Sequence, residues 1–101
     1  MIYDCIIDHI IEAITDKFID ITIIRKSKFD TRSAWFYYHD DDNCEICCAW
    51  IDDDVIIVSN IEAVQNVQWE LCDINMLDEV TNYIIGYIAE FKRCYKLGYD
   101  A

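Results

Sequence analysis

Residues 39–54 read HDDDNCEICCAWIDDD, and the predicted fold of this chain rests on their pattern. Two aspartate triplets, residues 40–42 and 52–54, enclose a short run of Cys, Ile, Ala and Trp. Aspartate is common in turns, and a short apolar run between two turn signals is typical of a buried strand. The stretch therefore predicts a strand over residues 44–51 with a hairpin turn at each end. Because each turn reverses the chain, the triplets are expected at opposite ends of that strand.

Helical periodicity at both ends of the chain encloses segments of period-two alternation. Apolar residues recur at helical spacing over residues 2–18 and again from residue 75 onward. Alternation between these helices predicts strands over residues 19–26, 35–38, 44–51, 55–59 and 67–71.

Three local signals refine these elements. Ser59 and Glu62 fit a capping box, which favours a short helix between the last two strands. Gly98 is placed to cap the C-terminal helix, and Gly86 inside that helix is expected to allow close packing on the sheet.

The predicted fold class is α+β, with one domain over residues 1–101. The order is an N-terminal helix, an antiparallel meander of four to five strands and a C-terminal helix. Helices on one face of an antiparallel sheet form a two-layer sandwich, and the other face of the sheet then has no helix to cover it. An uncovered sheet face that mixes aromatic and acidic groups is a candidate interface.

The two sheet faces are predicted from the register of the first hairpin. A four-residue turn would place Tyr37 opposite Ile46 and Trp35 opposite Cys48. That face, joined by Trp50, is expected to meet the helices. The uncovered face is expected to carry Tyr38, Glu45, Phe36, Cys47, Ala49, Glu70 and Asp20.

The charge of the chain is strongly one-sided. Its 101 residues include 20 acidic and 8 basic side chains, for a net charge of -12, and 54% are hydrophobic. Residues 33–91 contain thirteen Asp and Glu and no Lys or Arg. The hydrophobic fraction argues against disorder, and the charge excludes ordinary binding to nucleic acid or anionic membranes. Asp4, where a signal peptide carries Lys or Arg, and the lack of a membrane-length apolar run predict a cytoplasmic protein with reduced cysteines.

Metal sites and catalysis are not predicted. His39, Cys44, Cys47 and Cys48 contain one C-x2-C, but zinc needs a second pair, and alternation directs Cys47 and Cys48 to opposite faces. Small buried thiols are the simpler interpretation. The aspartates lack the spaced pattern and the glycine of a calcium loop. No nucleophile–base signature and no phosphate-cradling loop is present, so we expect no cofactor and no enzyme activity.

The acidic surface predicts a basic protein partner. Fields of one sign destabilise a compact fold through self-repulsion, so an excess of carboxylates suggests a partner of opposite charge. Carboxylates would occupy the places of phosphates, and aromatic side chains would supply much of the affinity. The predicted partner-binding residues are Tyr38, Asp40, Asp41, Asp42, Glu45, Asp52, Asp53, Asp54 and Glu70.

In size, acidity and helix–meander–helix order, the chain resembles the small immunity proteins that neutralise bacterial nuclease toxins, the partners of colicins and of contact-dependent inhibition toxins. The resemblance covers the whole chain and rests on composition and layout, without a shared motif, so no family residue is transferred. It implies a stoichiometric inhibitor, made in the cytosol, that binds a basic toxin domain at or beside its active site. We expect the protein to be a monomer or a weak homodimer.

Two other functions fit the same sequence. A phage-encoded anti-CRISPR or anti-restriction mimic of DNA would use the same acidic surface against a host defence complex. A small acidic secretion chaperone would instead be an obligate dimer that clamps an unfolded partner segment. The neighbouring genes would separate the first two functions, and a monomer in solution would count against the third.

Overall fold

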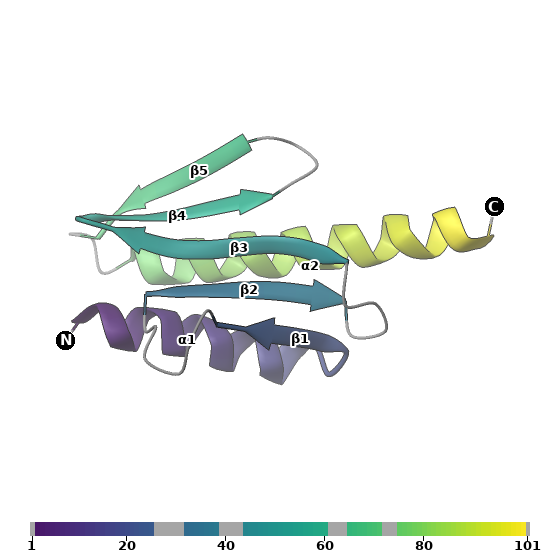
Figure 1. Ribbon diagram of the computed structural model, residues 1–101, viewed down its shortest axis with the longest axis horizontal. Helices are drawn as coiled ribbons and strands as arrows, with labels where there is room; N and C mark the ends of the chain where they lie inside the picture. The colour runs from purple at the N-terminus through teal and green to yellow at the C-terminus, as the bar shows by residue number, and fades with distance from the viewer. Residues whose placement is uncertain (1, 26–31, 39–43, 61–64, 72–74, 101) are drawn as a thin grey trace.

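The computed structural model describes residues 2–25, 32–38, 44–60, 65–71 and 75–100 of the chain. In chain order the elements are α1 (Ile2–Lys17), β1 (Ile21–Ile24), β2 (Ser33–Tyr38), β3 (Glu45–Asp52), β4 (Val55–Asn60), β5 (Gln65–Glu70) and α2 (Met76–Asp100) (Figure 1). This order confirms the predicted α+β arrangement of helix, antiparallel meander and helix.

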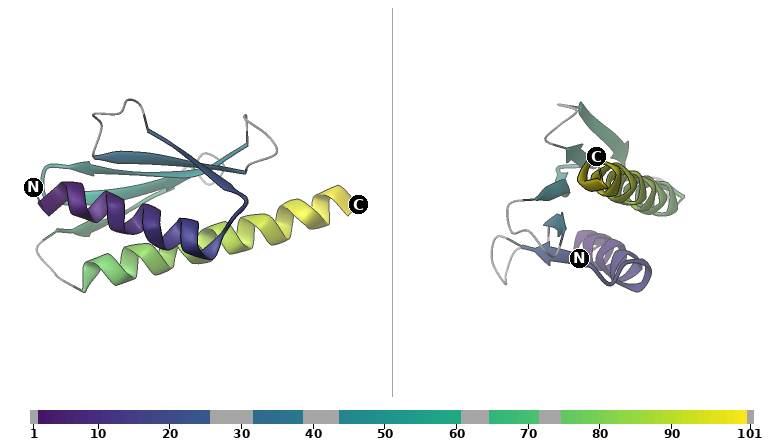
Figure 2. Two further views of the ribbon diagram at one scale, coloured as in Figure 1. Left: turned by 90° about the horizontal axis from the view of Figure 1, so that it is seen from below. Right: turned by 90° about the vertical axis from the view of Figure 1, so that its right-hand side faces the viewer.

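The strands form one sheet in the order β1-β2-β3-β4-β5, and each neighbouring pair is antiparallel. Both helices lie on the same side of this sheet, next to each other (Figure 2). The molecule therefore has a helical layer and a sheet layer, and neither helix covers the second face of the sheet.

Each helix turns one apolar stripe toward the sheet. Buried residues recur every three or four positions, which is the spacing that brings side chains to one face of a helix. Burying one large aliphatic side chain stabilises a fold by about 1.5–3 kcal/mol, so these stripes hold the helices on the sheet. The central positions of the stripes are Ile7, Ile10, Ile14, Val80, Ile84 and Ile88.

The face of the sheet beneath the helices carries mostly small and aliphatic side chains. Around Phe36, which is 0% exposed, the buried residues of β2, β3 and β4 include Ala34, Ile46, Cys47, Ala49, Ile51, Ile56 and Val58.

The predicted assignment of the two faces is wrong. Phe36, Cys47 and Ala49 meet the helices, whereas Trp35 and Trp50 lie on the uncovered face. β2 and β3 are apolar on both faces, so alternation fixes which residues share a face but not which face the helices cover. Small side chains such as Ala49 let helices approach the sheet closely, and a Trp can remain half-buried with its indole N–H near water.

A β-bulge in the first hairpin changes the predicted register. Phe36 pairs with Cys47, and the next residue, Tyr37, pairs with Glu45, so Ile46 has no partner on β2. Trp35 opposite Cys48 is confirmed, but Tyr37 opposite Ile46 is wrong. The extra residue lets both Ile46 and Cys47 enter the core, and it brings Glu45 opposite Tyr37 on the uncovered face.

Two residues predicted on the uncovered face belong to the helical side. Tyr38 is buried, and its ring centroid lies 6.5 Å from that of Phe91 on α2. Asp20 lies in the turn before β1, where Lys92 of α2 donates a hydrogen bond of 2.7 Å to it. Both predictions of position are corrected, because β1 pairs with β2 in a register that places Ile21 beside Tyr38 over the helices.

Several element ends differ from prediction. β1 begins at Ile21, and Ile19 lies in a turn with its side chain 100% exposed. Ser59 is part of β4, so it does not cap a helix, and the rest of that predicted helix falls largely outside the described residues. α2 continues through Gly98 to Asp100, and a Cβ added at Gly86 would meet nothing within 4 Å. Gly86 therefore makes no close contact with the sheet.

Candidate binding face

The sheet face that neither helix covers is the candidate binding site, and we call it the open face. Strand pairing brings its side chains into cross-strand rows, with Ser33 opposite Trp50 and Trp35 opposite Cys48 on β2 and β3. The side chains of the open face include Trp35, Tyr37, Glu45, Cys48, Trp50, Asp52, Val55, Ile57 and Glu70.

Two tryptophans form the aromatic centre of the open face. Trp35 and Trp50 stand on adjacent strands. Trp35 pairs with Cys48, and Trp50 pairs with Ser33, so the two tryptophans are offset by two residues along the strands. Such diagonal neighbours are roughly 7–8 Å apart, within reach of aromatic side chains. Both are half-buried, and Ile57 of β4 extends the apolar surface beside Trp50.

Tyr37 and Glu45 form a hydrogen-bonded pair next to this centre. The Tyr37 hydroxyl donates to Glu45 Oε1 at 3.2 Å. Burial, followed by this bond and the negative charge of Glu45, raises the pKa of Tyr37 above its ordinary value. The phenol therefore stays protonated and remains a donor, which fixes the carboxylate in one orientation.

Cys48 lies between the aromatic centre and Glu45. Burial and the charge of Glu45 raise the pKa of its thiol to about 11, so it is neutral near pH 7. Cys47 points to the opposite face, where burial also raises its pKa, as alternation predicted for this pair. In the described part of the chain, no three His, Cys, Asp or Glu side chains gather in a way that could hold a metal ion. His39 lies outside that part.

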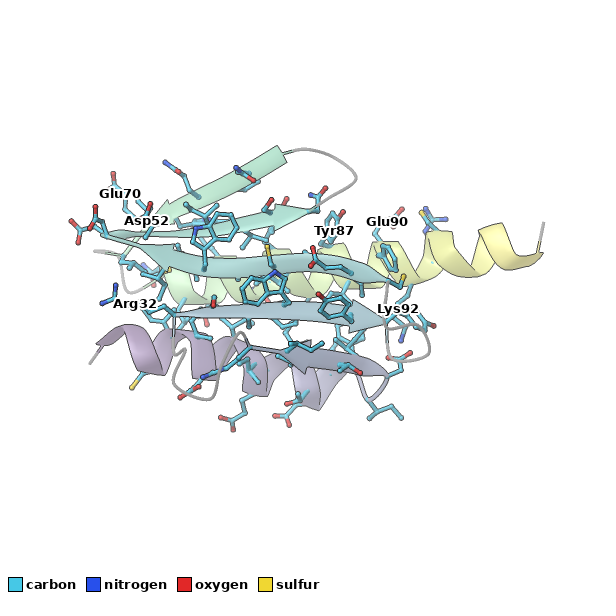
Figure 3. The ribbon with its side chains drawn as sticks, in the orientation of Figure 1. Arg32, Asp52, Glu70, Tyr87, Glu90 and Lys92 are labelled. Carbon is cyan, nitrogen blue, oxygen red and sulfur yellow. The ribbon has the colours of Figure 1, made fainter. Side chains whose placement is uncertain are left out.

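Carboxylates gather at the end of the sheet where β3 turns into β4. Asp52 pairs with Val55, and Val55 pairs with Glu70, so both acids lie in one row (Figure 3). The backbone N–H of Leu71 donates to the carbonyl of Asp54 at 2.7 Å, which holds the turn against β5. We call Asp52, Asp53, Asp54 and Glu70 the acidic end.

Arg32 reaches the same end of the sheet. Its carbonyl accepts a hydrogen bond of 2.8 Å from the backbone N–H of Ile51, and its side chain lies on the same side of the molecule as Asp52 and Glu70 (Figure 3). The cation-free stretch of the sequence is therefore not free of cations in space. The signal was available: residues that precede β2 must lie beside the end of β3 in an antiparallel hairpin.

Three further cations form ion pairs on the helical side of the molecule. Lys92 binds Asp20, and Arg25 binds Asp8. Arg93 binds Glu90 one turn earlier on α2, and this ion pair lowers the pKa of the Glu90 carboxyl. These three pairs lie away from the open face.

The predicted site residues thus separate into three groups. Asp52, Asp53, Asp54 and Glu70 come together, whereas Glu45 lies at the other end of β3. Tyr38 is buried beneath the helices, and Asp40, Asp41 and Asp42 lie outside the described residues. Sequence reasoning missed Trp35, Tyr37 and Trp50 as members of the same face as Glu45, because it placed these aromatics against the helices.

Comparison with protein-family models, with curated proteins and with solved structures finds no match to this chain. Among the described residues, no helix is both long and apolar enough to span a membrane.

Proposed function

We propose that this protein is a stoichiometric inhibitor that binds a basic, nucleic-acid-processing toxin through the open face and the acidic end. One observation carries the proposal: two tryptophans, a tyrosine and carboxylates share the one sheet face that has no helix over it. Carboxylates would stand where the toxin expects the phosphates of its nucleic acid, so bound inhibitor and substrate would exclude each other.

The aromatic centre suits the role of an affinity anchor. Tryptophan and tyrosine are enriched among the residues that carry most of the binding free energy in protein interfaces. Strand pairing fixes the backbone of Trp35 and Trp50, so little backbone ordering is left for the moment of binding. Trp50→Ala is therefore expected to weaken the complex mainly by speeding dissociation.

The acidic end suits the role of a steering surface. Its aspartates are exposed at a hairpin tip, and exposed charges act chiefly on the association rate. With a net charge of -12, the protein presents an attractive field to a basic partner and a repulsive field to nucleic acid.

The test is capture of partners from the source lysate by the tagged protein, followed by binding at rising salt and by a nuclease assay. We expect a basic nuclease that is inhibited at a one-to-one ratio, with affinity that falls as salt rises. Trp50→Ala should weaken capture, whereas Ile19→Ala, which removes an exposed apolar side chain outside the open face, should not.

Other captured partners would contradict the proposal in distinct ways. A host defence complex would indicate an anti-CRISPR or anti-restriction mimic of DNA. An unfolded export substrate bound by a dimer would indicate a secretion chaperone. A partner with a neutral or acidic surface, or binding that is indifferent to salt, would refute the electrostatic basis of all the inhibitor functions.

A further inference from the structure

We infer that the open face contains a recognition site for one arginine side chain of the partner, formed by Trp35, Tyr37, Glu45 and Cys48. We call these four residues the arginine cradle. The inference deepens the proposed function and rests on it for the identity of the protein that supplies the arginine. The guanidinium would lie against the Trp35 ring and donate hydrogen bonds to the Glu45 carboxylate.

The bulge at Ile46 directs Glu45 to the open face. In a regular hairpin, the residue after Cys47 in the direction of Glu45 would face Tyr37, and Glu45 itself would fall on the helix-covered side. The extra residue instead pairs Glu45 with Tyr37. Bulges recur where a fold has to re-aim a side chain, and here the result is a carboxylate among aromatic rings.

The Glu45 carboxylate uses only part of its hydrogen-bonding capacity within the described part of the chain. Tyr37 donates one hydrogen bond to Oε1, at 3.2 Å. An ionised carboxylate has about four acceptor positions on its two oxygens, so most of its capacity remains for a ligand. In the described part of the chain, Tyr37 is the only hydrogen-bond partner of this carboxylate, and no ion pair involves it.

Aromatic side chains and a neutral thiol lie near the Glu45 carboxylate. Tyr37 stands opposite Glu45, and Trp35, two residues along the same strand, stands opposite Cys48, so two aromatic side chains share the open face with Glu45. Cys48 between them is half-buried and adds a neutral, polarisable floor. Cations bind the faces of aromatic rings, and half-buried surroundings strengthen their attraction to a carboxylate.

The combination of an indole face and a carboxylate favours arginine over lysine, because the guanidinium of arginine is planar. A guanidinium can stack on an indole and at the same time form two parallel hydrogen bonds with a carboxylate. An ammonium is a compact, strongly hydrated charge and would have to give up water to lie against Trp35. A basic partner therefore gains most here by presenting an arginine, which is also the residue that nucleic-acid-binding surfaces use for phosphates.

The test uses nuclear magnetic resonance of the three indole N–H groups with small probes. Nα-acetyl-arginine amide is titrated into the protein and compared with the lysine and citrulline analogues. We expect a saturable shift of the Trp35 indole, with the arginine probe binding about fivefold more tightly than lysine and citrulline not binding. Trp69 is an internal control, because its ring packs against Tyr83 on α2, at 5.3 Å between centroids.

Charge-matched variants separate the cradle from general attraction. Glu45→Gln should weaken arginine binding by about tenfold, whereas Glu70→Gln, which removes the same charge at the other end of the face, should change it less than about twofold. Circular dichroism would verify that both variants remain folded. Equal binding of arginine and lysine, equal effects of the two variants, or no saturable shift at Trp35 would each overturn the inference.

Failure of the arginine cradle can be distinguished from failure of the proposed function. If no basic partner is captured but the arginine probe binds as expected, the cradle stands and the toxin-inhibitor function fails. If a toxin is inhibited and Glu45→Gln affects neither inhibition nor probe binding, the function stands and the cradle is refuted.

Discussion

Lys92 and Asp20 join α2 to the turn that precedes β1, with Nζ 2.6 Å from Oδ2, although the two residues are 72 positions apart. Their side chains are only 22% and 21% exposed. The ammonium also lies 5.2 Å from the centre of the Phe18 ring at the end of α1. This pair therefore connects both helices to the edge of the sheet that β1 forms.

A double-mutant cycle on this pair should reveal a favourable coupling. Asp20→Asn and Lys92→Met, alone and together, are expected to give a coupling of about 1 kcal/mol in the free energy of unfolding, because partial burial limits screening. Urea denaturation measures it. The exposed pair Glu90 and Arg93 is the control, with a coupling too small to resolve. Equal couplings for the two pairs would mean that burial does not strengthen the first.

Gly86 lies within α2 with open space beside it. Gly86→Ala should raise the free energy of unfolding by about 0.5–1 kcal/mol, because alanine restricts the unfolded chain and favours helix. The reverse change at an exposed position of the same helix, Ala89→Gly, should lower it by a similar amount. Chemical denaturation of both variants is the measurement. Destabilisation by Gly86→Ala would mean that a neighbouring group occupies the open space.

The assignment of the sheet faces predicts a clear order of stability. Phe36→Ala removes a fully buried ring and should cost about 3–5 kcal/mol, whereas Trp50→Ala removes a half-buried one and should cost about 1–2 kcal/mol. Urea denaturation of the two variants tests the order. A larger loss for Trp50→Ala would indicate that the helices cover the opposite face.

Those same residues show what the sequence determines. Period-two alternation correctly separated Trp35 and Trp50 from Phe36 and Ala49, and the assumed four-residue turn correctly paired Trp35 with Cys48. Alternation could not say which set meets the helices, because both are apolar and the decision depends on how closely a helix can approach. The order of elements was predictable because helical and strand periods differ strongly along this chain.

The register of the pairs next to the β2–β3 turn was not predictable in the same way. The bulge at Ile46 adds one residue to β3 without any Gly or Pro to announce it. One added residue transfers every side chain beyond it to the other face. Glu45 was therefore predicted on the correct face only because two errors cancelled: the bulge was missed, and the two faces of the sheet were exchanged. The acidic end was predicted in part, since turn chemistry located Asp53 but not the neighbouring Arg32.

The Cys48 thiol should make the stability of the protein depend on pH in the alkaline range. Burial raises the pKa of its thiol from an ordinary value of 9.0 to about 11 in the folded protein. Between these values the unfolded chain loses its proton while the folded protein keeps it, so stability is full below pH 9 and falls as pH rises toward 11. Cys48→Ser removes this titration and should flatten the loss. Urea denaturation at pH 7, 9 and 10 measures it.

The exposed thiol of Cys94 provides the control for that experiment. Cys94→Ser should leave the pH dependence of the wild-type protein unchanged, since other titrating groups contribute equally to both. If Cys48→Ser and Cys94→Ser behave alike between pH 9 and 10, the Cys48 thiol is not desolvated by its position between Trp35 and Glu45.

The acidic end should govern how fast the basic partner arrives. Asp52→Asn, Asp53→Asn and Asp54→Asn together remove three exposed carboxylates from one hairpin tip. At low ionic strength we expect association to slow by about tenfold, with little change in dissociation, because exposed charges steer encounters from a distance. Stopped-flow or surface-binding kinetics over a range of salt measure both rates, and the dependence on salt should become shallower.

The matched control removes three exposed carboxylates from the helical layer, at Glu12, Asp16 and Glu79. Its net charge equals that of the tip variant, so any difference between the two reports where the partner approaches. The control should slow association less, because its charges lie across the molecule from the open face. If the two variants slow association equally, the partner responds only to net charge, and the aspartates at the β3–β4 turn serve the hairpin alone.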